Sequence, residues 1–98
     1  MREYVSEIEG YMDERLNLWK KESHIENGDV VQIIWQFEQS HIILDIFWKD
    51  GDEYLNLECR SPLRKRNDHL KGLDEDTFDK ITDRIGNFAT WAQVKKHP

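Results

Sequence analysis

Residues 30–60 read VVQIIWQFEQSHIILDIFWKDGDEYLNLECR, and apolar and polar side chains alternate along much of this stretch. Alternation with a period of two is typical of a β-strand that buries one face. Asp50 and Gly51 interrupt the pattern, and an Asp-Gly pair favours a two-residue type I′ turn between antiparallel strands. The stretch therefore predicts three consecutive strands, at residues 30–37, 42–48 and 53–60.

The two connections between these strands assign the same face of the middle strand to the core. A turn at residues 38–41 pairs Phe37 with Ile42. The Asp-Gly turn independently pairs Leu44 with Leu57. Both pairings predict one buried face, made of Ile42, Leu44, Ile46, Leu55 and Leu57.

The first helix is expected before the strands, at about residues 3–26. Drawn as a helix, this segment places eight apolar side chains on one arc of about 160°. Ser6 and Glu9 have the spacing of a capping box near its beginning. Asn27 and Gly28 supply a left-handed stop at its end.

The last helix is expected at about residues 74–95. Apolar residues recur there at steps of three and four, and Asp74 is placed to cap the first turn. Leu73 and Phe78 hold the two positions of a hydrophobic staple around that cap. Residues 60–72, between the strands and this helix, contain proline, glycine and five basic residues, which predicts a basic loop.

These elements predict an α+β fold in the order α-β-β-β-α. The apolar face of a three-stranded antiparallel meander needs a cover, and two helices on that one face complete a two-layer arrangement. A chain of 98 residues has room for one hydrophobic core. We therefore expect a single domain at residues 1–98.

Charge and composition limit the partners and the cellular compartment that we expect for the protein. The chain has a net charge of −6 and a pI near 5.1, which disfavours nucleic acid and anionic membranes as partners. Its apolar runs are shorter than the roughly 20 residues of a membrane-spanning helix, and no signal-peptide core follows Met1. Cys59 is the only cysteine, so an intramolecular disulfide cannot form, as is typical of a reducing compartment. We expect a cytoplasmic protein with no membrane partner.

The sheet face opposite the core carries the first candidate site. In the predicted register Asp45 lies opposite Asn56 and diagonal to Glu58. Two neighbouring carboxylates can bind a divalent metal or share a proton. Asp45, with the Glu-x-Arg motif that begins at Glu58, resembles the core of the PD-(D/E)xK nucleases and implies a metal-dependent nuclease, although Arg60 stands where Lys is expected. The alternative is a solvent-exposed face on which Glu58 and Arg60 pair.

The second candidate is the basic segment at residues 60–71, which carries five cations and one acid. Such a run can contact the phosphate groups of nucleic acid. The helix-sheet order also resembles double-stranded-RNA-binding domains, but this last helix begins Asp74-Glu75-Asp76 where those domains present lysines. Two alternatives are open: the segment binds an acidic protein partner, or it neutralises the acidic helices of its own chain.

The third candidate is the acidic surface of the two predicted helices. In size, charge and element order the chain resembles some phage-encoded inhibitors and toxin-immunity proteins, which occupy basic nucleic-acid-binding or catalytic grooves. The resemblance implies a basic protein partner, and the alternative is an ordinary solvent-exposed helix face. The acids are Glu3, Glu7, Glu9, Asp13, Glu14, Glu22, Asp74, Glu75, Asp76, Asp79 and Asp83.

We interpret the chain as a non-enzymatic protein-interaction domain, of inhibitor or immunity type, that binds a basic surface of another protein. The sequence has no motif for a nucleophile with its base and no glycine-rich phosphate loop, and we expect neither a cofactor nor a metal. Nucleic-acid binding through residues 60–71 is the alternative, and a degenerate PD-(D/E)xK-like nuclease core is the third reading. The expected partner-binding residues are Asp45, Phe47, Tyr54, Asn56, Glu58, Arg60, Arg64, Lys65, Arg66 and Lys71.

Overall fold

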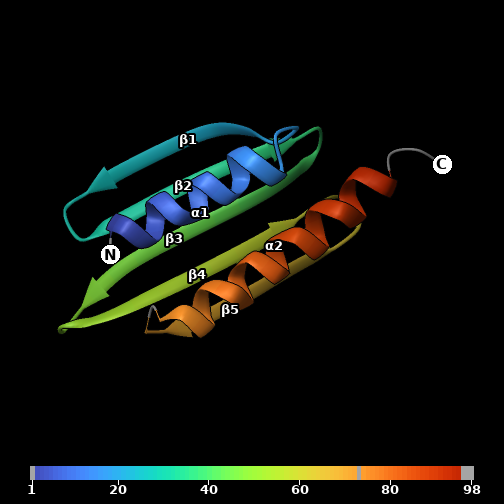
Figure 1. The fold of residues 1–98 in the computed structure, drawn as a ribbon. Helices are drawn as coiled ribbons and strands as arrows, with labels where there is room; N and C mark the ends of the chain where they lie inside the picture. Colours follow the sequence, from blue (N-terminus) through green and yellow to red (C-terminus); the bar gives the residue numbers. More distant parts are fainter. Residues whose placement is uncertain (1, 73, 96–98) are drawn as a thin grey trace.

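A computed structural model describes residues 2–72 and 74–95, which form five antiparallel strands in one open sheet and two helices (Figure 1). The α+β class is confirmed. The strands lie in the sheet in the order of the sequence, so each strand pairs with its neighbours along the chain. The elements are α1 (Arg2–Arg15), β1 (Lys20–Asn27), β2 (Val30–Phe37), β3 (Ser40–Lys49), β4 (Asp52–Arg60), β5 (Lys65–Lys71) and α2 (Glu75–Lys95).

The hairpin between β3 and β4 follows the sequence prediction. Asp50 and Gly51 both have positive φ, at 54° and 80°, as a type I′ turn requires. This turn pairs Leu44 with Leu57, and the predicted register of the hairpin is confirmed. Its strands, Ser40–Lys49 and Asp52–Arg60, are longer than expected by three residues and one residue, respectively.

The hairpin between β2 and β3 is tighter than predicted. Phe37 pairs with Ser40 across a two-residue turn, and Trp35 pairs with Ile42, so the predicted pairing of Phe37 with Ile42 is wrong by two residues. The positive φ of 55° at Glu38 makes the short turn possible. Because side chains alternate with a period of two, this shift leaves every residue on its predicted face.

The predicted first helix at residues 3–26 is wrong in its second half. The helix α1 ends at Arg15, and after a turn the segment Lys20–Asn27 forms the edge strand β1. Its end, with Gly28 at a φ of 60°, begins a hairpin turn to β2 instead of a helix stop. The prediction extended the helix too far because the arc of apolar residues included Leu18. In the structure Leu18 follows the end of α1, and its side chain is exposed.

The predicted three-stranded meander and the predicted loop at residues 60–72 are also wrong. The segment Lys65–Lys71 pairs antiparallel with β4 and becomes the fifth strand, so only residues 61–64 separate the two strands. Leu70 is the only apolar residue of β5, and the charged side chains suit an edge strand because they discourage pairing with another chain. The loop prediction failed because the segment lacks alternating apolar residues.

The core lies between the sheet and the two helices, which both lie on one side of the sheet (Figure 1). All five residues predicted for the buried sheet face are at most 1% exposed, whereas Asp45 and Glu58 lie on the opposite face. The N-terminus of α2 is capped as predicted. Asp74 Oδ1 accepts hydrogen bonds from Thr77 N and Oγ1, each at 2.9 Å. The predicted staple involves Leu73, which lies outside the described residues.

Candidate functional site

The face of the sheet that turns away from the helices, here called the open face, collects most of the predicted site residues. Side chains on paired positions of neighbouring strands share a face, so each row can be followed across all five strands. One row runs through the centre of the open face, from Ile25 through Asp45 to His69. The predicted residues on this face are Asp45, Phe47, Tyr54, Asn56, Glu58, Arg60, Lys65 and Lys71.

Polar groups at the centre of the open face bind one another. Gln32 Nε2 donates a hydrogen bond to Asp45 Oδ1 at 2.8 Å. Asn56 Oδ1 lies 2.6 Å from Nδ1 of His69 on the edge strand β5. Asp45 and Asn56 are therefore opposite each other, as predicted, but each bonds to a different neighbour.

The carboxylate of Glu58 lies between two cations. Glu58 Oε2 is 3.4 Å from Arg60 Nη1, and Glu58 Oε1 is 3.8 Å from Lys65 Nζ. In residues 2–72 and 74–95 no three His, Cys, Asp or Glu side chains form a group that can hold a metal ion. Cys59, between the two charged residues of the Glu-x-Arg motif, is buried on the core side, where burial and then the charge of Asp68 raise the pKa of its thiol to about 12.

An apolar strip crosses the open face beside these polar groups. Ile25 and Val30 are 53% and 45% exposed, which is unusual for branched aliphatic side chains in a sheet. The rings of Phe47 and Tyr54 stack with centroids 5.3 Å apart, and Lys71 Nζ lies 5.9 Å from the Tyr54 centroid. The part of this strip at Ile25 was missed because β1 was assigned to a helix.

The basic segment at residues 60–71 does not form one patch. Lys65 and Lys71 project onto the open face, whereas Arg66 projects to the helix side and pairs with Asp68 at 3.5 Å. Arg64 precedes β5 and stacks on Trp91 of α2, with its guanidinium carbon 4.5 Å from the ring centroid. A strand alternates its side chains between two faces, and this alternation divides the cations that the sequence places together.

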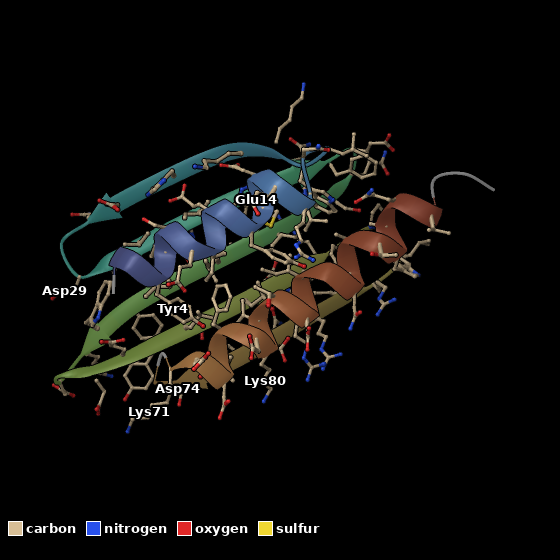
Figure 2. The ribbon with its side chains drawn as sticks, in the orientation of Figure 1. Tyr4, Glu14, Asp29, Lys71, Asp74 and Lys80 are labelled. Atoms are coloured by element: carbon tan, nitrogen blue, oxygen red, sulfur yellow. The ribbon has the colours of Figure 1, made fainter. Side chains whose placement is uncertain are left out.

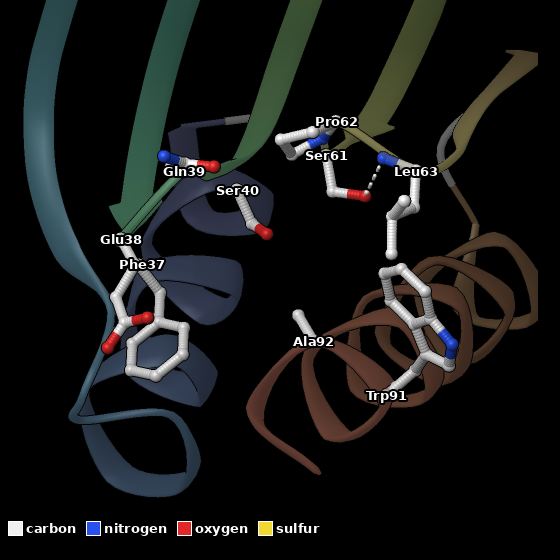
Figure 3. A pocket seen from close by; sticks show the side chains of 9 residues that line it. All are labelled: Phe37, Glu38, Gln39, Ser40, Ser61, Pro62, Leu63, Trp91 and Ala92. Atoms are coloured by element: carbon white, nitrogen blue, oxygen red, sulfur yellow. Dashed lines mark hydrogen bonds between the residues drawn. The ribbon is translucent and has the colours of Figure 1, made fainter. Parts of the chain in front are cut away.

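A first cavity, of about 330 Å³, opens between the end of α2 and the turns at that end of the sheet (Figure 3). Leu63, which is 74% exposed, and Trp91 stand on one side of it (Figure 3). Ser61 Oγ holds the loop by accepting hydrogen bonds from the backbone N–H groups of Leu63 and Arg64, both at 3.2 Å. Its walls come from three segments that lie far apart in the chain, so no local sequence pattern could predict it.

The two helices form an acidic surface, here called the acidic helical side. Residues 2–15 carry a net charge of −3 and residues 74–95 a net charge of −2, so the helical segments account for five of the six net negative charges. Both helices lie on the same side of the sheet (Figure 1). The exposed acids of this side are Glu7, Asp13, Glu14, Asp74, Glu75, Asp76, Asp79 and Asp83.

A second cavity, of about 450 Å³, lies between α1 and the beginning of α2. Figure 2 shows Tyr4 and Asp74 at the same end of the two helices. The ring of Tyr4 meets the ring of Phe78 edge-on, with centroids 5.7 Å apart. Tyr4 is one of the eight apolar residues on the arc of the predicted first helix, but the sequence could not show that two chain segments about seventy residues apart enclose a cavity. The residues that line it are Tyr4, Glu7, Asp74, Glu75, Phe78 and Asp79.

Comparisons with known proteins found no relative of this chain. No protein-family model matches the chain. Neither the curated proteins nor the solved structures include a significant match to it. In the described residues, neither helix is both long and apolar enough to cross a membrane.

Proposed function

We propose that this protein is a non-enzymatic domain that acts by binding a basic surface of another protein. The observation that supports the proposal best is the charge of the acidic helical side, which holds five of the six net negative charges on one side of the sheet. A field of one sign over one side of a molecule attracts partners of the opposite charge and orients them during the encounter.

The partner surface that fits best is a basic groove. Two parallel ridges of carboxylates, on α1 and α2, can face the cationic walls of a site for nucleic acid or an anionic substrate. Occupation of such a groove blocks it, which is the mode of phage-encoded inhibitors and toxin-immunity proteins. We place this activity in the cytoplasm, because the single cysteine, Cys59, cannot form an intramolecular disulfide, as is typical of proteins in a reducing compartment.

Charge pairs alone do not give such a complex its affinity. An exposed ion pair contributes about 0–1 kcal/mol, so the acids set the association rate and the choice of partner. A tight complex also needs side chains that fill pockets at the centre of the interface. The cavity between α1 and α2 lies within the acidic helical side and offers such a pocket.

A second candidate function is supported by the open face. Arg60, Lys65 and Lys71 project from it, and Lys71 lies beside the stacked rings of Phe47 and Tyr54. Cations next to exposed aromatic rings are the usual means by which a sheet binds single-stranded nucleic acid. Two observations weigh against this candidate: Glu58 pairs with two of these cations, and the net charge of the chain repels phosphates.

Affinity capture separates the two candidates. The tagged protein is incubated with native lysate, with and without nuclease treatment, and captured proteins are identified. Our proposal expects a partner with a basic surface whose capture survives nuclease treatment. Capture that disappears with nuclease, together with direct binding of the purified protein to nucleic acid at physiological salt, would favour the open face instead.

A further inference from the structure

The cavity between α1 and the beginning of α2 contains negative charge that the chain does not neutralise. Four carboxylates line it, from Glu7, Asp74, Glu75 and Asp79. None of the four forms an ion pair with a cation in residues 2–72 and 74–95. Asp74 Oδ1 accepts two hydrogen bonds from Thr77, but no cation of these residues neutralises the four carboxylates that an entering cation meets.

Helix capping explains only half of these carboxylates. Asp74 is the cap of α2 and Glu75 lies in its first turn, where negative charge complements the helix dipole. Glu7 and Asp79 lie beyond the first turn of their helices, where the dipole effect has faded. Their position beside the cavity is thus not explained by helix stability.

A buried hydroxyl without a hydrogen-bond partner in the described ranges is a second, independent feature of this cavity. Tyr4 is only 8% exposed, and its hydroxyl oxygen has no hydrogen-bond partner among the described residues. An unpaired buried hydroxyl is costly in a folded protein. Burial raises the pKa of this hydroxyl above its ordinary value, and the next contributions come from Asp74 and Glu7, so the hydroxyl lies within the field of the cavity's carboxylates. It stays protonated, and no group in the described part of the chain donates a hydrogen bond to its oxygen.

We propose that this cavity binds one basic side chain, of lysine or arginine, from the partner protein. The inference rests on the proposed function and names the point at which the partner is anchored. The alkyl stem of the side chain packs against the rings of Tyr4 and Phe78, which form an apolar wall. Its cationic head binds the carboxylates of Glu7 and Asp79 and donates a hydrogen bond to the Tyr4 hydroxyl.

Small cations test the cavity without the partner. Amide chemical shifts of the ¹⁵N-labelled protein are followed by NMR during titration with n-butylguanidinium, n-butylammonium, the uncharged n-butanol and magnesium. We expect saturable shifts centred on residues 4–8 and 74–79 with one or both organic cations. The absence of such shifts, equal shifts with n-butanol, or stronger binding of magnesium would overturn the inference.

Two variants connect the binding to the named groups. We expect Tyr4→Phe, which removes only the hydroxyl, to weaken the binding of the cation by several-fold, and Glu7→Gln with Asp79→Asn to weaken it by about tenfold or more. Glu14→Gln is the matched control, because Glu14 is an exposed acid on α1 outside the cavity (Figure 2). Affinities that are the same in all three variants would overturn the inference.

Failure of the inference can be told apart from failure of the proposed function. A cavity that binds no cation, in a protein that still captures a basic partner, contradicts the anchor alone. A cavity that binds cations, in a protein whose capture depends on nucleic acid, contradicts the proposed function and leaves the cation site standing.

Discussion

The hydroxyl of Tyr11 lies 2.7 Å from the position that a Cβ atom would take at Gly86. The same hydroxyl donates a hydrogen bond to the backbone oxygen of Thr82, at 3.2 Å. Gly86 thus allows α1 and α2 to approach, and Tyr11 ties the two helices together at this point. The acidic helical side depends on this contact, because it fixes the two ridges of carboxylates relative to each other.

The first prediction is that Gly86→Ala and Tyr11→Phe are coupled. Alanine favours a helix over glycine by about 1 kcal/mol, but its methyl group here displaces the Tyr11 hydroxyl and weakens a hydrogen bond worth about 1 kcal/mol. We therefore expect Gly86→Ala to be neutral or destabilising in the natural chain. In the Tyr11→Phe background, where no hydroxyl remains, we expect it to stabilise the protein.

Urea unfolding of the four proteins measures this coupling. The free energies of unfolding of the natural chain, the two single variants and the double variant form a double-mutant cycle. An effect of Gly86→Ala that is the same in both backgrounds would show that the two residues are not in contact.

The second prediction concerns the face of the sheet that supports the helices. Leu44 is 1% exposed beneath the helices, and its replacement by Ala should lower the free energy of unfolding by about 2–5 kcal/mol. Val30→Ala, on the open face, is the control and should cost less than about 1 kcal/mol, because Val30 is nearly half exposed. Urea denaturation checks both values, and an equal cost at the two positions would mean that the assignment of faces is wrong.

The third prediction concerns pH. Burial raises the pKa of Cys59 from 9.0 to about 12, so the folded protein disfavours the thiolate. The corresponding stability is fully present below pH 9 and is lost as the pH rises toward 12, by up to about 1.4 kcal/mol per pH unit. Because lysine and tyrosine side chains titrate in the same range, Cys59→Val serves as the reference. The free energy of unfolding should fall more steeply above pH 9 in the natural chain than in this variant.

A thiol reagent provides an independent measurement for the same residue. Iodoacetamide should react slowly with Cys59 in the folded protein at neutral pH and rapidly in urea, because the reactive thiolate forms only after unfolding. Equal rates in the two conditions would contradict the burial of this side chain.

The centre of the sheet could be predicted from the sequence, but its two edges could not. In β3 and β4 every second residue is apolar, and the Asp50-Gly51 turn fixes the register between them. In β1 and β5 only Ile25 and Leu70 are apolar, so the period of two is absent. These strands form because the free edges of the central hairpins supply hydrogen-bond partners, and this tertiary effect leaves no local pattern.

The candidate sites were predictable to the extent that they lie on the central hairpin of β3 and β4. Asp45, Asn56 and Glu58 lie on the predicted open face because the register of β3 and β4 was right. The basic segment was taken as one patch, and its division between Lys65 and Arg66 became visible only once β5 was known. The cavity beside Tyr4 needs two helices from opposite ends of the chain, and no local pattern joins them.

The acidic helical side is tested most directly by the kinetics of association with the captured, purified partner. Two charge-neutralised proteins are compared: one with Asp13→Asn, Glu14→Gln and Asp83→Asn on the helices, and a control with Arg60→Gln, Lys65→Gln and Lys71→Gln on the open face.

In surface plasmon resonance, we predict that the helical variant associates about tenfold more slowly at low salt. We also predict that its rate depends less on salt than that of the natural chain, and that the control associates at least as fast as the natural chain. A helical variant with an unchanged association rate, together with a control that no longer binds, would contradict the account.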